Sequence, residues 1–257
     1  MIQVSPVYQE NSLQNFSYII ELKDNQCFVV DPFDGDIIFD VLVEKKLKLK
    51  SIIITHEHVD HFCGVERLKE LTHVQEIWFS QIASEKIPFK ATKILQDGDI
   101  MYSSLGSSIT VFATPWHTFW HISLEIKNEE NISLIVWDTL FSGGVGNVRS
   151  GSVDDLFISI QKISKYPQNT KTYSGHDYLE NNLRFTLSLL PNNTFAQEIL
   201  KKRAAWFYFT TIEEEKQINL FLRLENHELR STLFWDIRSN ISQIEVFREL
   251  RKRRNDW

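Results

Sequence analysis

The chain has 257 residues, 42% of them hydrophobic, so it is long enough to bury a large core. Its formal net charge of −6 argues against general nucleic-acid binding, which normally needs a basic face. No apolar stretch is long enough to span a bilayer, and Met1-Ile2-Gln3-Val4 lacks the basic and apolar regions of a signal peptide. We therefore expect a cytoplasmic enzyme with neither a nucleic-acid nor a membrane partner.

Strands and helices alternate along the first part of the chain. The predicted strands are rich in branched or aromatic residues and end at polar or turn residues. They cover residues 16–22, 26–30, 52–54, 76–79, 109–113 and 132–136. Helical periodicity covers residues 36–46 and 65–72. This order predicts an α/β domain in which loops at strand ends supply the functional residues.

From about Leu179 the pattern changes to helical periodicity with few strand signals. The predicted helices there cover residues 183–190, 195–210 and 241–254. We therefore predict two domains, an α/β domain over residues 1–178 and a smaller helical domain over residues 179–257. Cys27 and Cys63 form no C-x-x-C pair, so neither a disulfide framework nor a thiolate zinc site is indicated.

The most specific motif is His56-Glu57-His58-Val59-Asp60-His61, directly after the predicted strand at residues 52–54. Three imidazoles and a carboxylate in six residues, at the turn that leaves a strand, can converge on one metal ion. Neutral imidazole suits zinc, iron, nickel or copper, and the carboxylate argues against a soft thiolate site. Zinc is the first expectation.

Three isolated residues, His117, Asp138 and His176, stand in similar positions after strands. Each, taken alone, is more simply an ordinary core or surface residue. Together with His56, His58, Asp60 and His61 they make seven candidate ligands. Seven is too many for one tetrahedral zinc ion and suits two ions that share a bridging carboxylate.

Several blocks resemble the metallo-β-lactamase superfamily and, within it, glyoxalase II, the hydroxyacylglutathione hydrolases. The similarity runs through nearly the whole chain, and its later blocks indicate the narrower family. The blocks are Thr55–His61, Thr114–His121, Trp137–Phe141, Ser174–Tyr178 and Asn182–Phe185. The resemblance implies a four-layered αββα sandwich with a dinuclear metal site, followed by a glutathione-binding helical domain.

The resemblance also implies which residue has which role. One ion would be bound by His56, His58 and His117, and the other by Asp60, His61 and His176, with Asp138 bridging the two. Zinc is expected at both positions, with iron or manganese as alternatives.

The reaction that the resemblance implies is hydrolysis of S-D-lactoylglutathione to glutathione and D-lactate, the last step of methylglyoxal detoxification. Two divalent ions sharing a water lower its pKa, so that a bridging hydroxide can attack the thioester carbonyl. Asp60 and Asp138 stay ionised beside the cations and are expected to accept the proton from the attacking water.

Glutathione has two carboxylates, so its site should contain cations. Arg251 and Arg254, three residues apart on a predicted helix, resemble the basic pair that binds the glycine carboxylate in this family. Tyr178 matches a position that contacts the tripeptide. A basic run at the end of a helix can also be a solvated face favoured by the helix dipole. The family's usual basic residue is replaced by Asn147, and Arg149 stands two positions on.

Glycines common in the family are replaced by bulkier residues beside the metal ligands, at Cys63, Trp116, Trp120 and Trp137. Glycine at such positions serves a special backbone angle or close packing. Two other interpretations stay open, and these tryptophans suggest the second of them. One is another enzyme of this fold, such as a mononuclear-iron persulfide dioxygenase, and the other is a non-catalytic metal-binding relative. A monomer is expected in each case.

Overall fold

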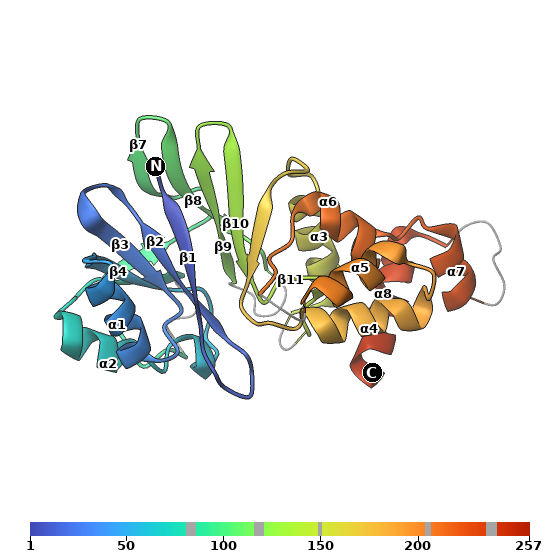
Figure 1. Cartoon of the computed structure of the whole chain (residues 1–257), viewed down its shortest axis with the longest axis horizontal. Coiled ribbons are helices and arrows are strands. Elements are labelled where there is room, and N and C mark those ends of the chain that lie inside the picture. Colours follow the sequence, from blue (N-terminus) through green and yellow to red (C-terminus); the bar gives the residue numbers. More distant parts are fainter. Residues whose placement is uncertain (81–85, 116–120, 149–150, 204–206, 235–240) are drawn as a thin grey trace. The chain divides into compact units, whose positions relative to one another are not determined.

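The computed structural model of the chain describes residues 1–80, 86–115, 121–148, 151–203, 207–234 and 241–257 (Figure 1). Its internal contacts divide the chain into two units. The first unit comprises residues 1–114 and 120–135, and the second comprises residues 115–119 and 136–257. Some of the predicted metal ligands lie in the first unit and the others lie in the second.

A six-stranded mixed sheet runs through the first unit in the order β1-β2-β3-β4-β5-β6. The first three strands pair antiparallel, and the strands from β3 to β6 pair parallel. Parallel neighbours need a crossover connection, and helix α1 supplies it between β3 and β4, as α2 does between β4 and β5. The bounds are β1 Gln3–Tyr8, β2 Phe16–Glu21, β3 Gln26–Val30, α1 Gly35–Glu44, β4 Lys48–Ile54, α2 Val65–Thr72, β5 Ile77–Ser80 and β6 Lys93–Leu95.

A second sheet is antiparallel, with neighbouring strands in the order β10-β9-β8-β7. On one face Leu124 and Ile135 lie opposite each other and are fully buried, whereas Glu125 and Lys127 alternate with Leu124 on the other face. The bounds are β7 Ile100–Ser104, β8 Ser107–Ala113, β9 Ile122–Asn128 and β10 Asn131–Trp137.

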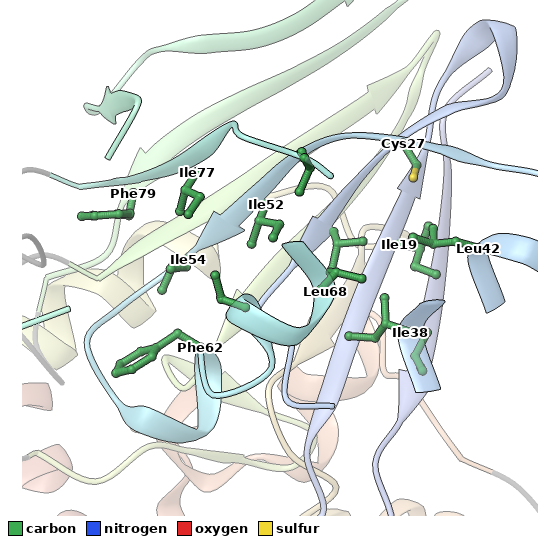
Figure 2. Close-up of a cluster of buried hydrophobic side chains, with 14 of the residues drawn as sticks. Ile19, Cys27, Ile38, Leu42, Ile52, Ile54, Phe62, Leu68, Ile77 and Phe79 are labelled. Atoms are coloured by element: carbon green, nitrogen blue, oxygen red, sulfur yellow. The ribbon is translucent and has the colours of Figure 1, made fainter. Parts of the chain in front are cut away.

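The core of the first unit lies between the six-stranded sheet and its two helices. Figure 2 shows Ile38 and Leu42 of α1 and Leu68 of α2 facing strand residues that include Ile19 and Ile52. These five side chains are all at most 3% exposed. Removing this apolar surface from water stabilises the sheet whose strand ends carry the predicted site.

Helices α1 and α2 approach closely because Gly64 has no side chain. A Cβ atom there would lie 2.8 Å from the carbonyl oxygen of Phe33 and 2.9 Å from the backbone nitrogen of Gly35. The backbone nitrogen of Gly64 also donates to the carbonyl of Pro32 at 2.9 Å. Gly64 therefore fixes the path of the chain just after the histidine-rich motif.

The second unit is mainly helical from α4 onward. Leu179, Leu183, Ala196, Ile199 and Ile218 form its apolar cluster. In the parts of the chain that the structure describes, no helix is long and apolar enough to cross a membrane. The bounds are β11 Leu140–Phe141, β12 Gly144–Val145, α3 Val153–Ile163, β13 Lys171–Ser174, α4 Leu179–Leu189, α5 Thr194–Arg203, α6 Ile212–Ile218, α7 His227–Leu233 and α8 Gln243–Asp256.

The predicted elements are confirmed except for one helix. Residues 195–210 were expected to form a single helix, but the structure describes α5 over Thr194–Arg203, and residues 207–210 are not helical. The backbone oxygen of Thr210 instead accepts from the backbone nitrogen of Thr172 at 2.8 Å, so this segment runs beside β13. Thr211 then caps α6 through a capping box with Glu214, which ends the extended segment.

Leu68 and Leu105 offer a matched test of this core. Leu68 is fully buried and Leu105 is 97% exposed in the turn between β7 and β8. We expect Leu68→Ala to lower the free energy of unfolding by about 3 kcal/mol and Leu105→Ala to change it by less than about 0.5 kcal/mol. Urea unfolding of both variants measures this. Equal losses would show that the burial described for α2 is wrong.

Candidate metal centre

Four predicted ligands of the first unit come together at the end of β4. His56 follows the strand, His58 has extended backbone, and a 3-10 turn, Val59–His61, places Asp60 and His61 close to them. The Nε2 atom of His56 lies 3.1 Å from Nδ1 of His58, and an Asp60 carboxylate oxygen lies 3.3 Å from Nε2 of His61. The loop therefore gathers imidazole nitrogens and a carboxylate, as the motif predicted.

The ring of His61 is oriented by a buried carboxylate that the sequence analysis did not identify, that of Asp31. An Asp31 oxygen lies 2.7 Å from Nδ1 of His61, and the carboxylate also accepts from the backbone nitrogen and hydroxyl of Thr55, at 2.8 and 2.6 Å. Burial raises the pKa of the Asp31 carboxyl, and the contacts with His61 and Thr55 oppose that rise. Asp31 follows β3 directly, so its position after a buried strand was the available signal.

The orientation of these rings fits a metal site. The Nδ1 atom of His56 lies 3.0 Å from the Thr55 hydroxyl and that of His61 contacts Asp31, so the Nε2 atom of each ring faces the other donors. Metal-binding histidines normally make such a contact through their second nitrogen. Donor atoms of Asp31, His56 and His61 lie within 4.8 Å of one another. Imidazole and carboxylate donors suit borderline divalent ions such as zinc or iron.

Asp60 is positioned by Asn15, which the sequence analysis also missed. The Asn15 amide donates to a carboxylate oxygen of Asp60 at 3.0 Å, and Asn15 is only 1% exposed. The amide of Asn11 donates to the Asn15 oxygen at 3.0 Å, which fixes the direction of the Asn15 side chain. The relevant contact spans 45 residues of sequence, and no local pattern indicates it.

His121, set aside in the sequence analysis, lies within the same cluster. It is fully buried, with its ring centroid 5.0 Å from that of His56 and its Nδ1 atom 3.0 Å from the Thr114 hydroxyl. The predicted ligand His117 lies outside the described residues, as do Trp116, Trp120 and Arg149.

Two further predicted ligands, Asp138 and His176, lie in the second unit. They follow β10 and β13, and their Oδ1 and Nε2 atoms are 3.3 Å apart. Both side chains are less than 10% exposed. The ring of Tyr178 stacks on that of His176 with centroids 5.0 Å apart and planes 1° apart. The structure therefore brings these three predicted residues together.

The predicted basic pair lies on α8, and both guanidinium groups contact the protein. Nη1 of Arg251 donates to the carbonyls of Val145 and Gly146, at 3.1 and 3.0 Å. Nη2 of Arg254 donates to the Asn182 side-chain oxygen at 3.2 Å. Burial lowers the pKa of Arg251 to about 10 and also lowers that of Arg254.

Two of the four replaced glycines can be located. Trp137 has a φ angle of 42° and is fully buried. This left-handed backbone explains why glycine is common there in the resembling family, since a side chain at positive φ is strained. Cys63 is exposed, and the close approach beside it is made by Gly64 instead, so a side chain at position 63 fits.

The positive φ angle at Trp137 should reverse the usual order of stability between glycine and alanine variants. Glycine in an ordinary strand is less stable than alanine by about 0.5–1 kcal/mol. Because φ is positive at residue 137, we expect Trp137→Gly to be more stable than Trp137→Ala by about 1 kcal/mol. Urea unfolding of the two variants compares them, with Val136→Gly and Val136→Ala as controls in the ordinary order. An alanine variant as stable as the glycine variant at residue 137 would contradict the strain.

Solved structures similar to the chain have low sequence identity to it and show the fold. A metallo-beta-lactamase from Staphylococcus aureus matches with a TM-score of 0.67 and 21% identity, over 98% of this chain and 71% of that one. ETHE1 from Myxococcus xanthus matches with a TM-score of 0.66 and 20% identity, over 96% and 89%. TTHA1623 in a di-iron-bound form matches with a TM-score of 0.61 and 20% identity, over 85% and 100%. The αββα metallo-β-lactamase fold is thereby confirmed.

Sequence comparisons identify the family. A family model described as the metallo-beta-lactamase superfamily matches residues 11–176, and one described as the hydroxyacylglutathione hydrolase C-terminus matches residues 177–257. A hydroxyacylglutathione hydrolase from Francisella philomiragia is 33% identical over 228 residues, 86% of this chain and 88% of that protein. One from Tolumonas auensis is 32% identical over 266 aligned positions, covering 100% of both. The chain therefore belongs to the hydroxyacylglutathione hydrolase family of the metallo-β-lactamase superfamily.

Proposed function

We propose that this metal-dependent hydrolase cleaves S-(2-hydroxyacyl)glutathione thioesters, with S-D-lactoylglutathione as its substrate and glutathione and D-lactate as products. Such a reaction is the last step of methylglyoxal detoxification. The observation that carries the proposal is the family match through both parts of the chain, combined with buried imidazoles whose second nitrogens are already bonded. The relative of that name from Tolumonas auensis is similar over its full length.

We propose that the family's two-metal arrangement applies here. His56, His58 and His117 would bind one ion, and Asp60, His61 and His176 the other, with Asp138 bridging them. Support comes from the orientation of His56 and His61 in the first unit and from the 3.3 Å approach of Asp138 to His176 in the second. Zinc is the proposed metal, and the di-iron form of TTHA1623 makes iron the first alternative.

The proposed reaction gives different roles to the metal ions and to the residues of the chain. Divalent ions at this site supply Lewis-acid activation of water and of the thioester carbonyl. In this proposal Asp60 and Asp138 would accept the proton of the attacking water. The amide of Asn15 occupies one oxygen of Asp60 and so directs the carboxylate. The leaving thiolate needs little protonation, because the pKa of a free cysteine thiol is about 8.5.

We propose that the helical residues 179–257 bind the glutathione part. Arg251 and Arg254 share one face of α8 and supply positive charge for the glycine carboxylate. Tyr178, Asn147 and Arg149 are the further proposed contacts, since each lies close in sequence to a metal ligand or to the segment that Arg251 contacts. A cytoplasmic monomer is part of the same proposal.

The test is hydrolysis of S-D-lactoylglutathione by the purified chain, with metal content measured on the same sample. We expect turnover with about two metal ions per chain, as a dinuclear mechanism requires. If the thioester were not hydrolysed, and the protein held one iron per chain and consumed oxygen only when a persulfide was supplied, the persulfide dioxygenase would be favoured. Tight metal binding with neither activity would favour a non-catalytic relative.

Asp138→Ala tests the proposed bridging ligand. We expect this variant to lose at least one metal ion per chain and to lower kcat by about 100-fold or more, because the lost carboxylate serves both ions. Asp40→Ala removes a carboxylate from the exposed face of α1 and is the control. If Asp138→Ala kept both the metal content and the turnover of the control, Asp138 would not be a ligand.

A further inference from the structure

A short hairpin follows Asp138 directly in the second unit, and we call residues 140–146 the glycine hairpin. Its strands are β11 and β12, and Gly143 in its turn has a φ angle of 74°. A Cβ atom on Gly144 would lie 2.6 Å from the side chain of Asn182, so the hairpin also needs glycine there. The hairpin connects the proposed bridging ligand, Asp138, to the proposed substrate contact, Asn147.

Side chains from α4, α6 and α8, and from Asn219 just after α6, bond backbone groups of consecutive hairpin residues. Loops normally satisfy their backbone groups with other backbone or with water, so five side-chain contacts in a row are unusual. They are Asn182 Nδ2 to Ser142 O at 3.0 Å, Gly143 N to Glu215 Oε1 at 2.8 Å, Asn219 Nδ2 to Gly144 O at 3.0 Å, and Arg251 Nη1 to Val145 O at 3.1 Å and to Gly146 O at 3.0 Å.

Glu215 makes the central contact of this set. It is fully buried, and its Oε1 atom accepts from Thr210 Oγ1 at 2.6 Å as well as from Gly143. Its Oε2 atom accepts from Asn219 Nδ2 at 2.6 Å, and that same amide reaches Gly144. One carboxylate therefore fixes two adjacent residues of the hairpin turn, one directly and one through Asn219.

Both terminal side-chain atoms of residue 215 must be hydrogen-bond acceptors, because each of them faces a donor. Asn219 cannot turn its amide around without loss, because its oxygen accepts from the backbone nitrogen of Phe221 at 3.1 Å. A glutamine at 215 would point its amide nitrogen at a second donor. Burial raises the pKa of Glu215 to about 7, while the bonds from Thr210, Gly143 and Asn219 oppose that rise.

We infer that Glu215 is a positioning residue for the proposed hydrolysis, acting through the glycine hairpin on Asp138 and Asn147. This inference rests on the proposed function and adds a residue that neither touches the substrate nor binds metal. A charge buried without a partner is costly, and here one of its partners, Gly143, belongs to the segment between two proposed functional residues. The alternative is a carboxylate that only stabilises the fold, which would leave the kinetics of the folded protein unchanged.

The experiment compares Glu215→Gln with Glu214→Gln, which makes the same change one residue earlier on α6. Glu214 bonds Thr211 and Tyr208 and does not bond the hairpin. With both variants assayed below their unfolding temperatures, we expect Glu215→Gln to lower kcat/KM at least about tenfold, in KM as well as kcat. Glu214→Gln keeps a residue type that a capping box accepts, and its kcat and KM should stay at wild-type values.

Zinc titration of the same proteins keeps the inference separate from the proposed reaction. If the wild type did not hydrolyse the thioester, the proposed function would fail, yet Glu215→Gln should still bind zinc about tenfold more weakly than Glu214→Gln. If Glu215→Gln did not fold, Asn219→Ala, which releases Gly144 and leaves Glu215 in place, should show the same direction with a smaller factor. Wild-type zinc affinity and kinetics in the folded Glu215 or Asn219 variant would overturn the inference.

Discussion

The buried carboxylate of Asp31 is the interaction on which the metal site of the first unit depends. The backbone nitrogen of Asp31 donates to the carbonyl of Ile53 at 2.9 Å, and the backbone carbonyl of Asp31 accepts from the hydroxyl of Ser17 at 2.7 Å. These bonds join β2, β3 and β4 at their ends. The carboxylate then fixes Thr55 and the ring of His61, so the strand ends and the metal-binding loop share one anchor.

Burying such a charge is unfavourable unless each oxygen is hydrogen bonded or paired. The Asp31 carboxylate meets that condition, because the backbone nitrogen and hydroxyl of Thr55 and Nδ1 of His61 all contact its oxygens. The cost of its desolvation is therefore offset by the same bonds that orient His61. A metal ion in this loop would then bind to rings that are already directed, which reduces the conformational entropy lost on binding.

The second unit follows the same principle with different residues. Asp138 and His176 stand directly after strands, and the segment beyond Asp138 is bonded by Glu215, Asn219 and Arg251 from the helices. Arg251 thus contacts the backbone of the glycine hairpin as well as offering positive charge. In both units a fully buried carboxylate, rather than a hydrophobic contact alone, determines where a predicted functional segment lies.

The features that were predicted correctly from the sequence are those formed by residues close together in the chain. The motif from His56 to His61 has its ligands within six consecutive residues just after one strand, so its position at the end of β4 followed from the pattern. The α/β order and the helical C-terminal part were predicted for the same reason. The helix expected to reach Thr210 was wrong, because pairing with β13 outweighed local helical periodicity.

The residues that orient the ligands could not be predicted, because their partners are distant in sequence. Asp31 contacts His61 across 30 residues, Asn15 contacts Asp60 across 45, and Gly143 contacts Glu215 across 72. A single polar residue in a strand end or helix carries no periodic signal that names its partner. Only the folded arrangement of β3, β4 and α6 shows which polar residue is buried against which ligand.

The measurement that tests this account most directly is the zinc affinity of Asp31→Asn, determined by competition with a chromophoric chelator. Asparagine preserves the size of the side chain but turns an amide donor toward either Thr55 or His61. We predict affinity about 10–100-fold weaker than that of the wild type, while Asp36→Asn, which alters an exposed carboxylate on α1, leaves it unchanged. Equal zinc affinity in Asp31→Asn and the wild type would contradict the account, because His61 would then be oriented without Asp31.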